Sequence, residues 1–332
     1  QTSATMRATL ALLVLFLGGS AAAQRRALKV SCPEDACVIS DPSENYGFIV
    51  SLNFDNADGP GGMCTGSLVS ESGWVLTAAH CCVDEETLEV DPSLEVTMRF
   101  APESKEDESA QSVIVPADDV YPHPDFNGND NDICLIAFDP DAIDWDELDV
   151  VNLIEGGYST PEDFEDETVQ VMGYGTTGNE EEDDSTDDIA FRTITLRTVA
   201  CPEGIAQSDV ICTEDLDEGD VCPGDSGGPL LWPTIVDNVP AFLQIGIVSQ
   251  GPQCADRIND PDALEQDRGE GMEGTWNFIP FQSEFLCSTA DLCDAWQLDD
   301  DGNPVASDEG GEEDQSPGDE DEAAGGSSGG EK

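Results

Sequence analysis

The chain has 332 residues, and its 73 Asp and Glu against 11 Lys and Arg give a net charge of −62 at pH 7. Such a field excludes nucleic acid and anionic membranes as natural partners and would attract basic peptides. The acidic residues are spread over the whole chain, so we interpret most of them as a solubility device in salty surroundings. The length favours one folded unit with appendages.

The first 23 residues are predicted to be a short upstream segment, Gln1–Thr5, followed by a secretory signal peptide. Met6-Arg7 supplies a positive start, Leu10–Leu17 an apolar stretch, and Ala21–Ala23 a small-residue cleavage region. A membrane anchor is the alternative, but the apolar run is shorter than the roughly 20 residues that span a bilayer. We therefore expect a secreted, extracellular or periplasmic protein, without a membrane partner, whose twelve cysteines are mostly paired.

Between residues 45 and 285 the sequence is typical of an all-β fold. Short runs of β-branched and aromatic residues alternate there with clusters of Gly, Pro, Asn and Asp. Their number and spacing favour barrels or a sandwich, and no alternating helices demand a parallel sheet. The runs that we expect to be strands are 48–52, 73–77, 94–100, 112–115, 168–172, 191–196 and 242–248.

Two acidic segments lack the apolar residues that a packed strand or helix needs. Of the 36 residues in 297–332, 13 are Asp or Glu and none is aromatic. Such a segment buries too little apolar surface to offset its ordering entropy, so we predict a disordered acidic tail. The run Glu180–Asp188 is predicted to be a solvated surface loop.

Three segments carry the residue types that amide hydrolysis requires: a nucleophile, a base, and donors for the developing oxyanion. Gly224-Asp225-Ser226-Gly227-Gly228-Pro229-Leu230 places a serine between glycines, where the backbone turns tightly. Thr77-Ala78-Ala79-His80-Cys81 follows an apolar run and presents a histidine. Asn131-Asp132-Ile133-Cys134-Leu135-Ile136 places a carboxylate at the mouth of an apolar run, where it could orient an imidazole.

Together these segments resemble the trypsin-like (chymotrypsin) serine peptidases, in that family's order His, Asp, Ser. The resemblance runs from about Tyr46 to Phe281 and implies two six-stranded antiparallel β-barrels with the active site in the cleft between them. We accordingly assign 24–37 as a possible propeptide and 38–296 as the peptidase domain. A serine endopeptidase of this family needs no cofactor, and we assign no metal site and expect a monomer.

By this resemblance, His80, Asp132 and Ser226 form the catalytic triad, with Ser226 the nucleophile, His80 the general base and then acid, and Asp132 the group that fixes the histidine tautomer. The backbone N–H groups of Gly224 and Ser226 form the oxyanion hole. The only other histidine is His123, and its two flanking prolines indicate a rigid surface connection.

The resemblance also implies a substrate pocket. Asp220 stands where the family places the residue at the floor of the pocket, Ser249 stands beside Asp132, and Gly251 and Gly274 match the glycines of the pocket walls. An aspartate at the closed end of a slot predicts protein or peptide substrates with Arg or Lys at the cleaved position. Alternatively, Asp220 is one more acid in an acidic stretch. Gln250 stands where members of the family commonly have an aromatic residue.

The cysteines agree with the family's framework in three pairs: Cys64–Cys81, Cys201–Cys212 and Cys222–Cys254. One family bridge is missing, its positions being Val169 and Trp232. The remaining six cysteines could pair as Cys32–Cys37, Cys82–Cys134 and Cys287–Cys293, although other pairings stay open.

One departure concerns activation. Family members mature by cleavage before an Ile-Val-Gly-Gly-like sequence, and the freed ammonium pairs with the aspartate that precedes the serine, here Asp225. No such tetrapeptide is present, and cleavage after Arg26 or Lys29 is an alternative. Without either, Asp225 needs another partner, because an unpaired buried carboxylate is costly.

Two other functions compete with the endopeptidase. One is a catalytically weak, zymogen-like homologue that acts as a binding protein, since a fold alone does not establish activity. The other is an adhesion or calcium-binding protein that uses carboxylates such as Glu103, Glu106 and Glu108, or the stretch Asn127–Asp130. These carboxylates lack a defined ligand spacing.

Overall fold

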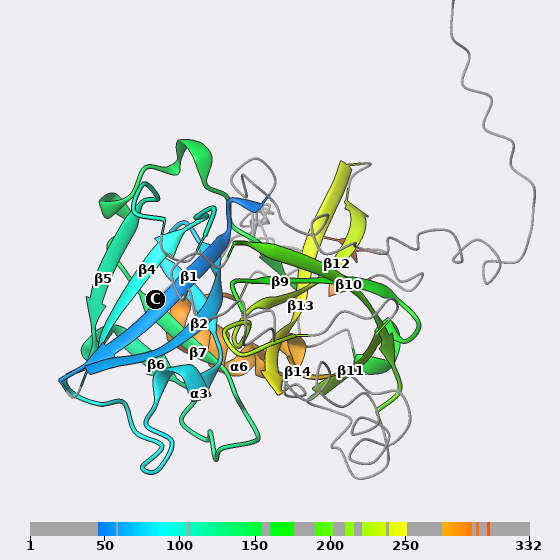
Figure 1. Cartoon of the computed structure of the whole chain (residues 1–332). Coiled ribbons are helices and arrows are strands. Elements are labelled where there is room, and N and C mark those ends of the chain that lie inside the picture. Colours follow the sequence, from blue (N-terminus) through cyan, green and yellow to red (C-terminus); the bar gives the residue numbers. More distant parts are fainter. Residues whose placement is uncertain are drawn as a thin grey trace, which may run out of the picture.

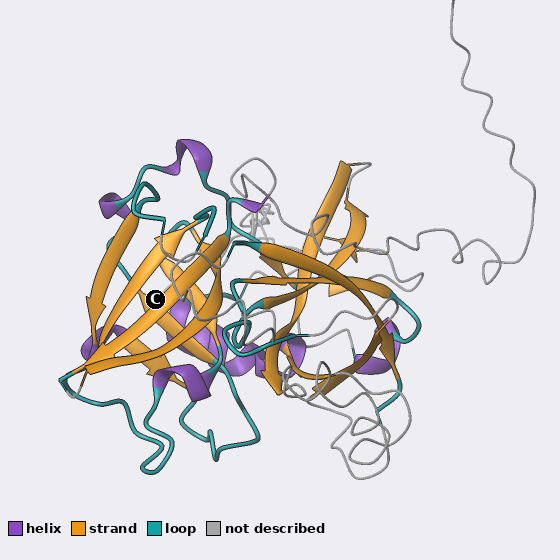
Figure 2. Cartoon of the chain, viewed as in Figure 1, coloured by secondary structure: helices purple, strands orange, loops and turns teal. Residues whose placement is uncertain are grey.

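The structure is a computed structural model. It describes residues 46–57, 59–104, 107–154, 160–175, 190–201, 210–215, 221–236, 239–250, 274–293, 297–298 and 304–305. Most of these residues belong to two seven-stranded β-sheets that lie side by side, one from each half of the chain (Figure 1). Figure 2 shows that helices are few and short. Among the helices in the described ranges, none has the length and apolar character to cross a membrane.

The first sheet is antiparallel, with the strand order β5-β4-β1-β2-β3-β7-β6. One face of the sheet meets the core, as in β4, where the alternate residues Val96, Met98 and Phe100 are buried. The strands are β1 (Ile49–Asn56), β2 (Gly59–Ser70), β3 (Trp74–Thr77), β4 (Glu95–Phe100), β5 (Ser112–Pro116), β6 (Val120–Pro122) and β7 (Cys134–Ala137).

The second sheet has the order β12-β9-β10-β11-β14-β13-β8, and an additional β12–β13 pairing closes six of its strands into a ring. The short β8 adds to β13 in parallel. Closure removes the exposed edges that an open sheet would leave. The strands are β8 (Asn152–Leu153), β9 (Thr168–Gly173), β10 (Arg192–Val199), β11 (Val210–Asp215), β12 (Pro229–Val236), β13 (Val239–Gln250) and β14 (Gly274–Phe278).

The predicted all-β, two-barrel fold is confirmed, with a difference between the halves. The second sheet is a closed six-stranded barrel, whereas the described strands of the first form a curled seven-stranded sheet without a closing pair. The sequence predicted six strands in each. The extra strand in each half, β6 or β8, has only three or two residues, too few for a recognisable pattern.

The helices within the described ranges are short. They include α3 (Ala79–Cys82), which carries His80, and α6 (Ser283–Ala290), which ends at the left-handed Asp291. The 3₁₀ turns are η1 (Ala117–Asp119), η2 (Pro140–Ala142), η3 (Trp145–Glu147), η4 (Pro161–Phe164) and η5 (Ile279–Gln282).

The segment expected to be a disordered tail is not wholly without structure. Gln297–Leu298 (β15) pairs with Pro304–Val305 (β16) in a two-stranded antiparallel sheet. The rest of 297–332 lies outside the described residues, as does the loop predicted over Glu180–Asp188.

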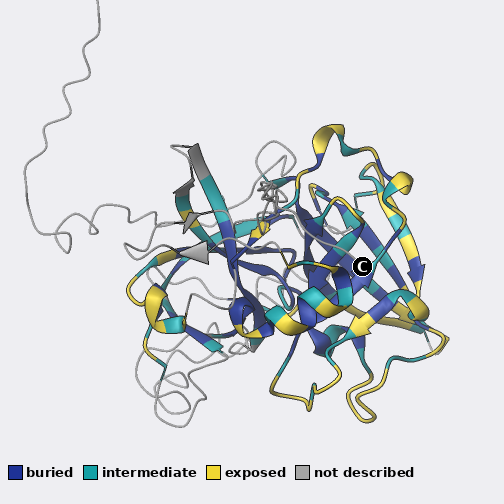
Figure 3. Cartoon of the chain, turned by 180° about the vertical axis from the view of Figure 1, so that it is seen from behind, coloured by how far each residue is buried: buried dark blue, intermediate teal, exposed yellow. Residues whose placement is uncertain are grey.

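One apolar cluster lies within the second barrel, whereas the larger one fills the first sheet and extends to residues of the second half such as Met172, Leu231 and Ile247. Polar contacts also join the two halves. Buried residues are concentrated on the strands, and exposed residues lie mostly on the connections (Figure 3). Between the halves, Ser67 Oγ donates to Gln244 Oε1 at 2.7 Å, and the Tyr174 hydroxyl donates to the Pro102 carbonyl at 2.9 Å. Both bonds join residues more than 70 positions apart. The halves therefore meet along a specific, hydrogen-bonded seam.

Candidate active site

His80 lies in α3, directly after the buried strand β3. Its backbone N–H donates to Asp132 Oδ1 at 2.8 Å, and its Nδ1 lies 2.7 Å from Asp132 Oδ2. An ionised carboxylate only accepts hydrogen bonds, so the imidazole proton belongs on Nδ1. Nε2 then keeps its lone pair, which is the state that a general base requires.

Asp132 is the most enclosed residue of this group, with 3% of its surface exposed. Besides the two bonds from His80, its Oδ2 accepts a 2.7 Å hydrogen bond from Ser249 Oγ. Its own carbonyl accepts from Asn277 Nδ2 at 2.8 Å. Asn131 precedes it with a φ of 58°, a left-handed conformation that asparagine tolerates. The carboxylate is thus held from both halves of the molecule.

The pKa of His80 is raised above its ordinary value by the balance of four effects. Burial lowers the pKa, but the hydrogen bond and charge of Asp132, together with the charge of Glu85, outweigh it. A raised pKa means that the imidazole readily accepts a proton, as a general base must.

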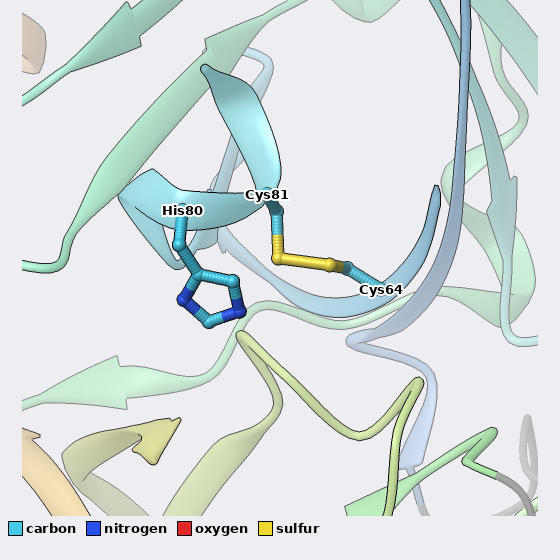
Figure 4. Close-up of side chains that lie close together, drawn as sticks. All are labelled: Cys64, His80 and Cys81. Carbon is cyan, nitrogen blue, oxygen red and sulfur yellow. A yellow bond between two sulfur atoms is a disulfide. The ribbon is translucent and has the colours of Figure 1, made fainter. Parts of the chain in front are cut away.

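Two disulfides brace the histidine and aspartate segments. Cys64–Cys81 ties α3 to β2, and Cys82–Cys134 joins the residues two positions after His80 and two positions after Asp132. Figure 4 shows His80 beside the Cys64–Cys81 bridge. The ring nitrogen and two sulfurs cluster closely, yet the sulfurs are bonded to each other and offer no thiolate to a metal ion.

Ser226 lies in a turn between Val221 and Pro229, the residue at which β12 begins. Its carbonyl accepts a 2.8 Å hydrogen bond from the Thr65 N–H, and the Thr65 hydroxyl donates to the Gly224 carbonyl at 2.9 Å. The Gly227 N–H donates to Val248 at 2.9 Å. The turn is therefore anchored on β2 of the first sheet and on β13 of the second.

Gly227 explains how the serine turn reaches the histidine. It has a φ of 78°, and an added Cβ would collide with the Thr77 hydroxyl, lie 2.5 Å from the Thr65 carbonyl oxygen and lie 2.8 Å from the Ala78 nitrogen. Thr77 and Ala78 directly precede the helix of His80. Only glycine accepts both this backbone conformation and this close approach. Within the described residues Ser226 Oγ makes no hydrogen bond to His80, a contact that commonly tightens only when substrate binds.

The amides of this turn divide into two groups. The N–H groups of Asp225, Gly227 and Gly228 donate to backbone carbonyls at 2.9 Å each. Those of Gly224 and Ser226 have no acceptor within the described part of the chain. Gly224 has a φ of 100°, which glycine adopts without strain. Two unused donors beside a serine hydroxyl can stabilise an oxyanion.

Asp225, next to the serine, has its carboxylate enclosed although the residue as a whole is partly exposed. Its oxygens accept from the Gly175 N–H at 2.8 Å and the Cys222 N–H at 2.9 Å. Burial raises its pKa to about 6, against the opposing effects of these two bonds and of the charge of Arg192. Asp225 therefore takes up its proton at a higher pH than an ordinary aspartate does.

The substrate-pocket residues are only partly described. Ser249 contacts Asp132, and Gly274 begins β14 opposite Thr213. Asp220 and Gly251 lie outside the described residues, and Gln250 is described only as the last residue of β13.

The other cysteines follow the expected framework where it is described. The pairs Cys201–Cys212 and Cys287–Cys293 are present. Cys222 is disulfide-bonded, and its expected partner Cys254, like Cys32 and Cys37, lies outside the described residues. Where the family bridge is missing, Val169 is fully buried and Trp232 packs edge-on against Phe164.

The model of the family described as Trypsin matches residues 39–263, which is more than half of the chain. The chain belongs to the trypsin family of serine endopeptidases. The match agrees with the resemblance carried by the His80, Asp132 and Ser226 segments, and the described fold continues beyond it through β14 and α6.

Individual members of the trypsin family are related at a distance. Urokinase-type plasminogen activator of Gallus gallus is 30% identical over 217 residues, which cover 58% of this chain and 46% of that protein. Kallikrein 1-related peptidase b16 of Mus musculus is 34% identical over 207 residues, covering 57% and 70% respectively. A venom serine protease of Polistes dominula is 26% identical over 216 residues, covering 59% and 70%. This chain thus spans about half of the first relative and about 70% of the others.

Proposed function

We propose that this member of the trypsin family is a secreted endopeptidase that cleaves peptide bonds through an acyl-enzyme on Ser226. The observation that carries the proposal is the double hydrogen bond from His80 to the buried Asp132, which leaves Nε2 as a base. Packing of Gly227 against Thr77 and Ala78 supports it, because it brings the serine turn to the histidine.

In the proposed reaction, Ser226 Oγ attacks the substrate carbonyl while His80 Nε2 takes its proton. The oxyanion accepts hydrogen bonds from the amides of Gly224 and Ser226. His80 then protonates the leaving amine, and a water activated by the same imidazole releases the acid product and restores Ser226. Asp132 stays ionised and stabilises the imidazolium in both halves of the reaction.

Covalent labelling tests this proposal directly. A fluorophosphonate probe should modify the secreted protein at Ser226, located by peptide mass spectrometry, and should not modify Ser226→Ala. His80→Ala should lose labelling at least a thousandfold in rate while the circular dichroism spectrum is unchanged. A folded protein that resists the probe would instead be the zymogen-like homologue that acts as a binding protein.

For specificity we propose cleavage after Arg or Lys, with Asp220 as the carboxylate that pairs with the substrate cation. Guanidinium can pair bidentately with a carboxylate, so Arg should exceed Lys. A panel of chromogenic peptides compares wild type with Asp220→Ser, which should lose the preference for basic residues. If wild type cleaves after Phe or Leu as readily as after Arg, the pocket assignment is wrong even if Ser226 is labelled.

We further propose an extracellular, monomeric enzyme whose acidic surface captures basic substrates. The apolar segment Leu10–Leu17 and the paired cysteines support export. N-terminal sequencing of secreted material should find a single terminus near residues 27–39 that coincides with activity. Substrate capture should slow with added salt, because ions screen the field of a chain with net charge −62.

A further inference from the structure

The carboxylate of Asp225 occupies a space that only glycines leave open. An added Cβ on Gly173 would collide with its Oδ1, and one on Gly175 would collide with its carboxylate group. The two hydrogen bonds that the carboxylate accepts come from neutral backbone amides. A carboxylate so enclosed is costly to ionise without a nearby positive charge.

The strand register places Arg192 on the side of the sheet where this carboxylate lies. Arg192 pairs directly with Gly173 between β10 and β9, and residues directly opposite each other project to the same face. That face, at Gly173, is the one that the Asp225 carboxylate fills. Arg192 Nη1 donates to the Gly175 carbonyl at 3.5 Å, and the Gly175 N–H donates to Asp225. The Arg192 guanidinium and the Asp225 carboxylate therefore bind the backbone of the same residue, Gly175.

Cations are rare in this fold, so their placement is informative. Arg99, Arg192 and Arg197 are the Lys and Arg residues of the described part of the chain. Arg197 is paired with Glu214. The charge of Arg192 acts on Asp225, where it favours the ionised form and opposes the effect of burial.

We propose that Arg192 is a positioning residue, an internal counter-charge that keeps Asp225 ionised and so holds the turn of Gly224 and Ser226 with its two unused amides outward. The proposal rests on the proposed function for its catalytic consequence. An ionised Asp225 can accept from Gly175 and Cys222 at once, which ties the turn to the end of β9. Protonation gives one oxygen a hydrogen and weakens this tie, and the flanking amides lose their fixed direction.

Arg192 is the charged group on which the ionisation of Asp225 depends, because its other neighbours are neutral. Strand β9 and the residues after it contribute Gly173, Tyr174 and Gly175, and the Tyr174 hydroxyl donates its hydrogen bond to the Pro102 carbonyl. From β2 comes the neutral Thr65, and from its own turn the Cys222 amide. Arg192, from β10, is the charged side chain acting on it among the described residues.

The sign of the pH dependence follows from this environment. Asp225 has a folded pKa of about 6, above its ordinary 3.8, so its ionisation reduces stability as pH rises between these values. Removing Arg192 should raise the pKa further. The loss of stability should then be small at pH 5, where Asp225 is protonated with or without Arg192, and large at pH 8.

The test compares urea unfolding at pH 5 and pH 8 in a Ser226→Ala background, which prevents autolysis and needs no activity. Arg192→Gln should increase the unfolding constant about tenfold more at pH 8 than at pH 5, the ratio expected for one pKa unit. Arg192→Lys should restore most of this. Arg197→Gln, on the same strand but paired with Glu214, is the matched control. It should change the unfolding constant by the same factor at pH 5 and at pH 8.

A double-mutant cycle and a kinetic measurement complete the test. In an Asp225→Asn background, Arg192→Gln should lose its pH-dependent effect. With Ser226 intact, Arg192→Gln should lower kcat more than it raises KM and shift the acid limb of kcat/KM to higher pH. Equal destabilisation by Arg192→Gln at pH 5 and pH 8, or an undiminished effect with Asp225→Asn, would overturn the proposal. Failure of Ser226 to react with the probe would overturn the proposed function, while the unfolding comparison would still be readable.

Discussion

The two halves of the candidate site are held in place by different means. The first sheet contributes His80 and Asp132, whose segments are linked by the Cys82–Cys134 disulfide and joined by hydrogen bonds on both carboxylate oxygens. The second barrel contributes Ser226, whose turn includes the disulfide-bonded Cys222 but is oriented next to the serine by close-packed glycines and by one enclosed carboxylate. Covalent links resist changes of pH, whereas a carboxylate with a pKa of about 6 does not. The geometry of the first half should therefore be independent of pH, whereas that of the serine turn in the second half should depend on the ionisation of Asp225.

The largest effect on kcat is expected from breaking the contact between Asp132 and His80. Asp132→Asn should reduce kcat about 10⁴-fold, because an amide no longer fixes the Nδ1 proton. Melting temperature should change little in comparison. Ser249→Ala is the control, since it removes one donor from Asp132 but leaves both bonds from His80; its kcat should fall by about tenfold at most. Comparable losses in the two variants would contradict the tautomer argument.

In the second half, the close approach of Gly227 can be tested by adding one methyl group. Gly227→Ala should cost about 4–5 kcal/mol of unfolding free energy, because the Cβ meets backbone as well as side-chain atoms at a positive φ. Gly62→Ala places its methyl group in open space and should cost under about 0.5 kcal/mol. Chemical denaturation of both variants decides the comparison.

The bridge between the triad segments of the first half should be worth more than the local bridge of the second. Replacing Cys82 and Cys134 by alanine opens a loop of 52 residues and should cost roughly 4 kcal/mol. The same change at Cys201 and Cys212, which are 11 residues apart, should cost roughly 3 kcal/mol. Melting curves of the two double variants test the order, and the reverse order would argue against a loop-entropy origin.

The pH profile sharpens the comparison at the level of single groups. The acid limb of kcat/KM for His80 should lie above pH 6.5, because Asp132 raises the imidazole pKa despite burial. In the residual activity of Asp132→Asn this limb should move to lower pH, since the charge of Asp132 is lost and burial is then opposed only by the charge of Glu85. A limb that stays in place would belong to another group, and Asp225 would be the first candidate.

The smallest effect is expected from the acidic segment after the barrels. Truncation after Val305 keeps the β15–β16 pair and should leave the melting temperature within about 1 °C of the full chain. Truncation after Trp296 removes that pair too and should cost slightly more, because it takes away the small sheet. A loss of several degrees in the shorter variant alone would assign that sheet a structural role.

Local patterns predicted the all-β class, and the family resemblance predicted the two barrels and proposed the three candidate catalytic segments. Strands 48–52, 94–100 and 168–172 were predictable because each is a short run rich in β-branched or aromatic residues, and each candidate segment is contiguous in the sequence. The pairs Cys64–Cys81 and Cys201–Cys212 followed from resemblance, and Cys82–Cys134 was one option among several. The two-residue strands β8, β15 and β16 escaped prediction because so short an element is defined by the strand beside it.

Long-range geometry supplied what those patterns lacked. Asp132 draws its donors from residues 52 and 117 positions away, and Arg192 reaches the surroundings of Asp225 only through its register with Gly173. The raised pKa of Asp225 could not be predicted from the sequence, because a carboxylate's pKa depends on what encloses it and which charges lie nearby. Spacing along a chain specifies residue types and periodicity, whereas enclosure and strand register arise only when distant segments pack together.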